Sequence, residues 1–277
     1  MPAVRFAQAA DRALRASVKV TAELVDLARR PPAGVVILLY HRVGAETCST
    51  VDLPLETFEE QMALLADSAH VVPLADALKI LAGGSGEPCV AVTFDDGTAD
   101  LVELALPVLV RYRVPSTWYL ATSFIDTPSS AAGAGRPLSW SGVRDACSTG
   151  LVSPGSHTHS HRLLDRIADS EVADELDRSI QSIEDNVGIA PVDFAYPKGL
   201  LGTPAAQEGV RARFRSAALA GTCANVVGHT DPYRLARSPI QVDDGRRWFE
   251  RKVAGGMALE DALRGMLNRY RHSEATT

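Results

Sequence analysis

Two adjacent carboxylates follow a short, largely apolar run in the first half of the chain. Residues 90–94 read Val-Ala-Val-Thr-Phe, and Asp95, Asp96 and Gly97 come directly after them. The run predicts a buried strand, and the Asp-Gly pair predicts a tight turn at its end. Neighbouring carboxylates repel each other, so both stay ionised only if a cation lies between them or their pKa values are driven apart. The segment indicates either a chemical site or an Asp-Gly turn that caps the next helix.

Three of the seven histidines lie within five residues, at His157, His159 and His161. His157 and His161 are four residues apart, so in a helical turn their imidazoles would share one face and could bind one transition metal. His159 would lie on another face. Zinc proteases with this spacing carry a glutamate after the first histidine, whereas this chain has Thr158. A catalytic base would therefore come from elsewhere, and a histidine-rich surface turn is the alternative interpretation.

The two clusters complement each other chemically. Asp96, His157 and His161 supply three ligands and leave open positions for water and substrate, which is the pattern of a catalytic metal site. The ligand types suit a single transition metal ion. A divalent ion lowers the pKa of its bound water towards about 7. Asp95 is then available as a base, so the combination predicts a catalytic metal site.

Strands and helices alternate along most of the chain, which indicates parallel β/α units in either an open doubly wound sheet or a barrel. In both architectures, chemistry gathers beyond the carboxyl ends of the strands, where Asp95 and Asp96 stand. Pro107 is expected to kink its helix. The loop 127–137 is predicted to border the site as a lid. The predicted strands are 35–39, 90–94, 116–121, 152–156, 192–196, 216–219 and 237–242; the predicted helices are 56–66, 75–81, 101–112, 140–147, 170–187, 204–214 and 260–270.

Composition limits the possible function classes. The 277 residues are 46% hydrophobic and 22% charged, which suits one domain of barrel size. The net charge of −6, without a basic cluster, argues against nucleic-acid binding. No apolar run approaches the roughly 20 residues of a membrane span. The four cysteines form no CxxC pair, and we recognise no cleavable leader, so we expect reduced thiols and a cytoplasmic location.

Residues 4–30 differ in character from the rest of the chain. Apolar residues recur there at spacings of four or seven, and six basic against three acidic residues give this segment a charge of +3. The pattern predicts an amphipathic helix that either packs on its own domain or lies as a peripheral contact on an anionic membrane surface. Residues 31–34, Pro-Pro-Ala-Gly, break the helix. We therefore expect an N-terminal extension at 1–33 and a catalytic domain at 34–277.

At its two motifs the chain resembles the polysaccharide deacetylases of carbohydrate esterase family 4. The first motif of that family, Thr-Phe-Asp-Asp-Gly, matches Thr93 to Gly97, and the second, His-Ser/Thr-x-x-His, matches His157 to His161. The similarity extends from about Val35 to Val242. It includes the segments 39–43, 115–117, 138–140 and 194–199.

The resemblance implies a distorted (β/α) barrel with about seven strands. It assigns Asp95 as the general base that activates a metal-bound water. It gives Asp96, His157 and His161 as the ligands of Zn²⁺ or another divalent transition metal such as Co²⁺, Ni²⁺ or Mn²⁺. The implied reaction is hydrolysis of an N- or O-acetyl group on a polysaccharide, oligosaccharide or sugar intermediate. In the family, a third motif contains a proline, and the backbone N–H of the residue after it stabilises the oxyanion. Pro197 with Lys198 is the local match. The alternative interpretation is a tight turn after a strand, which Pro197 and Gly199 would produce anyway.

The chain also departs from the family pattern. Many relatives carry an arginine two residues before that proline to orient the catalytic carboxylate, whereas Ala195 stands here. Arg237, on a late predicted strand, is the candidate substitute, with a surface ion pair as the alternative. The late Leu-x-His motif that often supplies the general acid has no match, and His229 does not fit it. His41, at the end of the first strand, is the best remaining candidate for a site histidine.

Three aromatic residues near strand ends, Tyr40, Trp140 and Tyr196, are candidates for stacking on a sugar, with the core as their alternative place. Two other functions remain open at this stage. The same site could hydrolyse a non-sugar amide such as a cyclic imide, since metal, base and oxyanion donor do not dictate the acyl group. The missing arginine and late histidine also allow a catalytically inactive glycan-binding relative, although the retained Asp95 argues against it.

Overall fold

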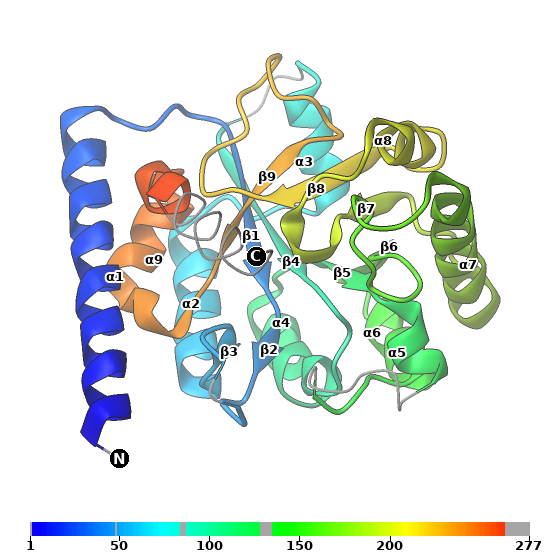
Figure 1. Ribbon diagram of the computed structural model, residues 1–277, viewed down its shortest axis with the longest axis horizontal. Helices are drawn as coiled ribbons and strands as arrows, with labels where there is room; N and C mark the ends of the chain where they lie inside the picture. The colour runs from blue at the N-terminus through cyan, green and yellow to red at the C-terminus, as the bar shows by residue number, and fades with distance from the viewer. Residues whose placement is uncertain (1, 48, 84–86, 128–134, 264–277) are drawn as a thin grey trace.

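Seven parallel strands close into a barrel, in the order β1-β4-β5-β6-β7-β8-β9, with β9 pairing back onto β1 (Figure 1). The computed structural model describes residues 2–47, 49–83, 87–127 and 135–263, with side chains from residue 15 onward. The predicted barrel of about seven strands is confirmed. The barrel strands are β1 (Val35–Tyr40), β4 (Cys89–Phe94), β5 (Ser116–Leu120), β6 (Val152–Ser156), β7 (Asp193–Ala195), β8 (Ser216–Ala220) and β9 (Leu235–Pro239), and a separate pair is β2 (Arg42–Val43) with β3 (Asp52–Leu53).

Helices surround the barrel, and α1 runs along one side of the molecule (Figure 1). The helices are α1 (Pro2–Ala28), α2 (Leu55–Ser68), α3 (Leu74–Leu81), α4 (Leu106–Tyr112), α5 (Thr122–Asp126), α6 (Trp140–Ser148), α7 (Asp169–Val187), α8 (Pro204–Arg211) and α9 (Gly245–Val253). Within the described residues, none of them is long and apolar enough to cross a bilayer. The boundary predicted between 1–33 and 34–277 falls between α1 and β1 and stays a prediction.

Several elements differ in detail from the prediction. The helix predicted at 101–112 begins as a wide π-turn at Leu101–Ala105, just before Pro107, whose missing N–H prevents a regular helix there. Helix α9 was not predicted, because most of its residues are charged and leave little apolar periodicity. The last predicted helix, 260–270, is helical up to residue 263, and the remainder lies outside the described residues. Most of the predicted lid, at 128–134, also lies outside them.

Alternation along the strands decides which side chains fill the barrel. On β1 and β4, Leu38 and Phe94 belong to the cluster that packs against surrounding helices, whereas Ile37 and Ala91 belong to a second cluster with Tyr119. The guanidinium of Arg237 on β9 lies over the ring of Tyr119 on β5, at 5.1 Å, although these strands are not neighbours. Contacts between strands that do not pair show that this second set of side chains occupies the interior.

Candidate metal centre at the carboxyl end of the barrel

The paired ends of β1 and β4 place the two carboxylates. The strands run in register, with Tyr40 opposite Phe94, and the backbone N–H of Asp95 donates to the Tyr40 carbonyl at 3.0 Å. Asp95 continues the inward alternation of its strand and is 2% exposed. Asp96 and Gly97 then take φ values of 74° and 89°, which turn the chain away from the strand direction. The two neighbouring carboxylates therefore face different surroundings.

The histidines are brought together by an irregular loop after β6. The N–H of His157 extends the ladder to the Leu120 carbonyl on β5 at 3.0 Å, and Thr158 and His161 both have positive φ, at 65° and 58°. Residues 157–161 are not helical. The expectation of a shared helical face was therefore wrong, because two left-handed residues reverse the loop and return His161 towards His157. Their ring centroids are 5.0 Å apart.

Asp96, His157 and His161 form a cluster whose ligand atoms all lie within 4.8 Å of one another. The Nε2 atoms of His161 and His157 are 3.4 Å and 3.8 Å from Asp96 Oδ1. Two ligands of a tetrahedral zinc ion, each bound at about 2.0–2.1 Å, lie about 3.3 Å apart. The separations are close to that value, so the residues fit a divalent cation.

The hydrogen bond of one imidazole and the pKa of the other suit the same use. Nδ1 of His157 lies 2.8 Å from the Ala195 carbonyl and donates to it, while Nε2 of the same ring faces Asp96. Burial, together with the charge of His157, lowers the pKa of His161 to about 4. His161 is thus neutral at physiological pH, as a metal ligand must be.

Asp95 is bound at its other side by Arg237. The two guanidinium nitrogens donate to the two carboxylate oxygens at 2.6 Å and 2.8 Å, and Arg237 is fully buried. Burial acts to raise the pKa of Asp95, but the adjacent Arg237 charge outweighs it and lowers this pKa to about 2. The alternative of a surface ion pair for Arg237 is excluded by its burial. Nε2 of His157 lies 3.7 Å from Asp95, so this carboxylate borders the metal cluster.

His41 and Lys198 lie around the same centre. His41 follows β1 as Asp95 follows β4, and a positive charge on His41 contributes to the low pKa of Asp95. Its Nδ1 atom is buried and has no hydrogen-bond partner among the described residues. Lys198 occupies the Pro197–Gly199 turn with a φ of 56°, and its charge contributes to the low pKa of His161.

Two of the three aromatic candidates are not available to a sugar. Tyr40 is fully buried, donates to Gln61 Oε1 on α2 at 2.9 Å and stacks on Phe94. Tyr196 is 1% exposed and packs edge-on against Phe194. The predicted stacking role is wrong for both, because their side chains point outward to the helices rather than into the barrel. Trp140 is half-buried and donates to Asp126 at the end of α5.

Glu175 on α7 is a site-supporting residue that sequence reasoning missed. Its buried carboxylate accepts hydrogen bonds from the backbone N–H and the hydroxyl of Ser160, and its carbonyl accepts from the N–H of His159. These bonds fix the loop between the two histidines of the cluster. The signal was a charge on the buried face of α7, next to Leu176. His159 itself turns to Thr122 Oγ1, at 2.8 Å, and is outside the metal cluster.

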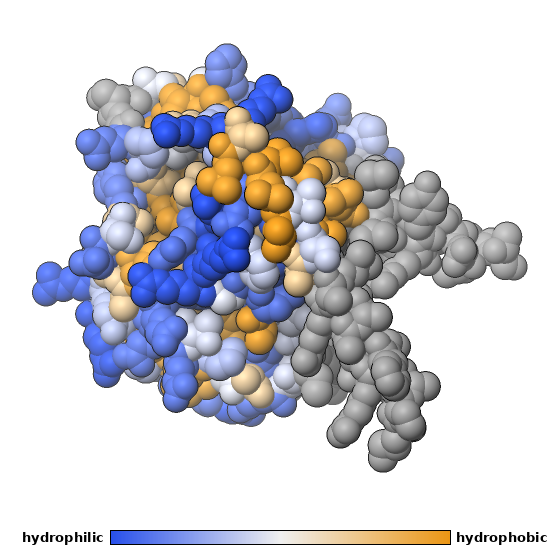
Figure 2. Space-filling view, turned by 90° about the vertical axis from the view of Figure 1, so that its left-hand side faces the viewer, coloured by the Kyte–Doolittle hydropathy of each residue, from blue (hydrophilic) through white to orange (hydrophobic). Residues whose placement is uncertain are grey.

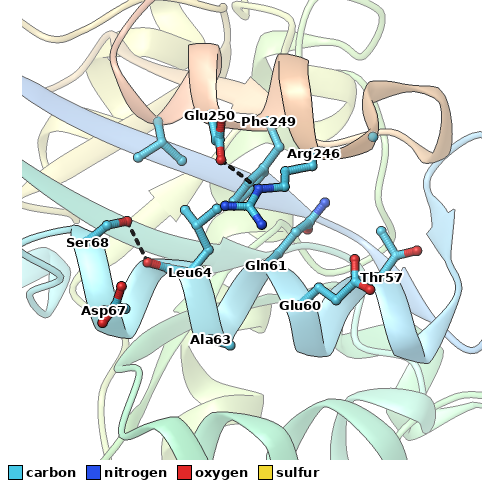
Figure 3. A pocket seen from close by; sticks show the side chains of 12 residues that line it. Thr57, Glu60, Gln61, Ala63, Leu64, Asp67, Ser68, Arg246, Phe249 and Glu250 are labelled. Carbon is cyan, nitrogen blue, oxygen red and sulfur yellow. Dashed lines mark hydrogen bonds and ion pairs between the residues drawn. The ribbon is translucent and has the colours of Figure 1, made fainter.

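A hollow lies away from this centre, between α2 and α9 (Figure 3). It has a volume of about 920 Å³. Its polar side chains bond locally, with Arg246 paired to Glu250 at 2.8 Å and the Ser68 hydroxyl donating to the Leu64 carbonyl. The described residues that line it include none of the metal cluster. We therefore place the candidate site at the carboxyl end of the barrel, where Asp96, His157 and His161 lie together, rather than in this hollow.

Comparison with known proteins places Asp95, Asp96, His157 and His161 within one matched family region. The sequence profile described as polysaccharide deacetylase matches residues 82–217, a range that contains both motifs but neither His41 nor Arg237. YxkH of Bacillus subtilis, whose name assigns it to the polysaccharide deacetylases, is 26% identical over 171 residues. That match covers 61% of this chain and 58% of the relative, so the chain spans well under two thirds of the relative's length.

Solved structures share the fold. IcaB from Ammonifex degensii superimposes with a TM-score of 0.68 at 24% identity, covering 81% of this chain and 97% of that one. The Streptococcus pyogenes deacetylase PplD, solved with acetate, gives 0.69 at 18% identity over 80% and 99% of the two chains. A de-N-acetylase from Aggregatibacter actinomycetemcomitans gives 0.67 at 20% identity over 79% and 99%. At these identities, the structural likeness establishes the barrel and not the substrate.

Proposed function

Since this chain belongs to the polysaccharide deacetylase family, we propose that it is a metal-dependent hydrolase that removes an acetyl group from a carbohydrate. The observation that carries the proposal is the placement of two adjacent carboxylates in separate roles. Asp96 lies with His157 and His161. Asp95 lies beside them and accepts two hydrogen bonds from the guanidinium of Arg237. Glycan binding alone requires no such ionised carboxylate at a metal cluster, which disfavours the inactive alternative.

Asp96, His157 and His161 would hold the divalent ion, with Zn²⁺ first and Co²⁺, Ni²⁺ or Mn²⁺ as alternatives. When bound, such an ion polarises the acetyl carbonyl and acidifies water at the site. Asp95, ionised at neutral pH, accepts the hydrogen bond of the attacking water and removes its proton as the new C–O bond forms. Arg237 holds that carboxylate in a fixed direction, because its bidentate contact restrains both oxygens.

Two more residues complete the proposed reaction. When the C–N bond breaks, the leaving nitrogen must take a proton. We assign this proton to His41, because His41 follows β1 as Asp95 follows the paired strand β4 and its Nδ1 has no partner within the described chain. Lys198 lies in the Pro197–Gly199 turn and its charge acts on His161, which supports its predicted part in stabilising the oxyanion. The products would be acetate and the freed amine of the sugar.

The Aggregatibacter relative is described as a de-N-acetylase, so we take an N-acetylated glycan as the first substrate to test. A screen should measure acetate release from N-acetylglucosamine oligomers and acetylated xylan, together with ring opening of a cyclic imide. Turnover of the imide alone would replace the proposed substrate class with the alternative one. A cytoplasmic location remains a prediction.

Two substitutions separate the base from the ligands. Asp95→Asn should lower kcat by about 10²- to 10⁴-fold while leaving bound metal near the wild-type amount, because only the proton acceptor is lost. His157→Ala should lose the metal itself. The matched control is His159→Gln, which changes a histidine of the same loop outside the cluster and should keep both properties. Metal content by elemental analysis and acetate release report the outcome; unchanged metal in His157→Ala would contradict the ligand assignment.

A further inference from the structure

Three charged side chains of helix α1 face the segment 243–257, which contains α9. Lys19, Glu23 and Asp26 are spaced by four and three residues and so share one face. Lys19 and Glu23 are buried, although lysine and glutamate are ordinarily exposed. Their partners all lie in residues 243–257: Lys19 Nζ binds Asp244 at 2.6 Å and Asp243 at 3.0 Å, Glu23 pairs with Arg247 and Arg251, and Asp26 accepts from the Met257 N–H at 2.7 Å.

The outward face of α1 is correspondingly apolar. Four of the nine exposed large hydrophobic residues in the described chain lie on it, and the other five lie outside α1. Figure 2 views this side of the molecule and shows hydrophobic side chains gathered in one area. The four are Val20, Leu24, Val25 and Leu27, with exposed fractions of 40%, 60%, 45% and 61%.

The rest of this face carries little that would resist a nonpolar surrounding. From residue 15 to residue 30, the exposed set contains no acidic residue, and it ends in Arg29 and Arg30. The hydroxyl of Thr21 already donates to the Ser17 carbonyl at 2.8 Å. Satisfying this hydroxyl within the helix lowers the cost of removing it from water.

We propose that this face of α1 docks on the surface of an anionic lipid bilayer, with the helix lying in the plane of the interface. Leucine and valine side chains would enter the boundary between headgroups and acyl chains, while Arg29 and Arg30 contact anionic headgroups. The charge distribution fits this partner. Residues 4–30 carry +3 in a chain of net −6, which leaves −9 for the remainder.

A bilayer suits this face better than a second copy of the chain. Pairing two copies through α1 would bring two segments of charge +3 together, whereas an anionic surface attracts them. The inference does not depend on the proposed function, because it uses none of the residues of the metal centre.

The test is binding of the full chain to vesicles of phosphatidylcholine, with and without phosphatidylglycerol, measured by flotation. Wild type should bind the anionic vesicles, and less so at high salt. The double variant Leu24→Gln with Leu27→Gln should lose at least about tenfold in partition, because both exposed side chains leave the lipid. Arg29→Gln with Arg30→Gln should lose roughly 30-fold on anionic vesicles.

The matched control is Ile189→Gln with Val192→Gln, two residues of similar exposure, 46% and 45%, that lie outside α1. This control should bind as wild type does. The proposal is overturned if wild type fails to bind anionic vesicles, if the leucine variant binds equally well, or if the control loses as much. It is also overturned if sedimentation shows a lipid-free dimer that the leucine variant converts to monomer.

Discussion

Asp95 and Asp96 are adjacent in sequence, but their carboxylates have different electrostatic surroundings. Asp95 is buried against a guanidinium, whereas the Asp96 side chain is 22% exposed and faces two imidazoles. Burial acts to raise the pKa of Asp95, and the Arg237 charge is the largest of the effects that lower it. The neighbouring carboxylates therefore have separate partners, as the proposed division between a metal ligand and a base requires.

Replacing Arg237 should therefore move the pH dependence of activity. In Arg237→Met, the countercharge is lost while burial remains, so the pKa of Asp95 rises from about 2 and the acidic limb of kcat/KM shifts to higher pH. Arg237→Lys keeps a charge and should shift the limb less. Metal-loaded enzyme is assayed across the acidic range. An acidic limb identical in all three proteins would show that Arg237 does not act through Asp95.

The same ion pair links pH to stability. The pKa of Asp95 is lower in the folded protein than its ordinary value of 3.8. Its contribution to the free energy of unfolding is therefore complete above the ordinary value and is lost as the pH falls from there towards about 2. Arg237→Met removes that contribution, so its stability should change less over this window than that of wild type.

At the level of elements, strands were predictable because their burial is continuous, and the carboxyl ends followed from the parallel order. The alternation of inward and outward side chains along a strand was not used to place the aromatic residues. Neighbouring residues of a strand face opposite sides, so a residue next to an inward-facing position faces outward. Tyr40 directly precedes His41 and Tyr196 directly follows Ala195, so neither ring can share the barrel side with its neighbour. The sequence therefore held enough information to reject both as stacking residues.

Other features depended on contacts that no local pattern carries. The left-handed turns at Thr158 and His161 exist because α7 supplies Glu175 to hold Ser160, and that pairing joins residues fifteen positions apart. Arg237 reaches Asp95 across the barrel from a strand 142 residues later. Long-range pairs of this kind require the closed topology to be known first.

Gly155 on β6 tests how tightly that interior is packed. A Cβ added there would lie 2.5 Å from Tyr119 Cδ1 and 3.1 Å from the Asp193 carbonyl oxygen. Gly155→Ala should lower the free energy of unfolding by about 1–3 kcal/mol, because the buried ring has to move. Gly209→Ala on α8 is the matched control: its nearest neighbour would be at 3.5 Å, and alanine should stabilise the helix by up to about 1 kcal/mol. Urea unfolding measures both, and equal effects would contradict the packing argument.

At the scale of the whole molecule, buried charged side chains attach α1 to the segment that contains α9. Asp244 accepts from two buried lysines, Lys19 of α1 at 2.6 Å and Lys252 of α9 at 2.8 Å. Few large apolar contacts are needed there, so the apolar residues of α1 remain available on its other side. The arrangement explains how one helix can belong to the fold and still present a surface for binding.

Asp244→Asn should therefore release α1. Burial would raise the pKa of Asp244, but Lys252 and Lys19 hold it below the ordinary value of 3.8, so the network stabilises the protein above that pH and weakens as the pH falls. Removing the carboxylate leaves two buried ammonium groups short of countercharge, and we expect a loss of about 3–5 kcal/mol at neutral pH. Amide exchange should accelerate first around Lys19, because that residue loses its strongest bond to the barrel.

The matched control for this change is Asp76→Asn, whose ion pair with Lys79 at 2.7 Å is solvent-exposed on α3. An exposed pair contributes at most about 1 kcal/mol, so this variant should unfold near the wild-type urea midpoint. If both variants lost the same stability, burial of the Asp244 network would not be what secures the helix. If Asp244→Asn unfolded early without faster exchange in α1, the network would serve α9 and the barrel, and the attachment of α1 would have to rest on Glu23 and Asp26 instead.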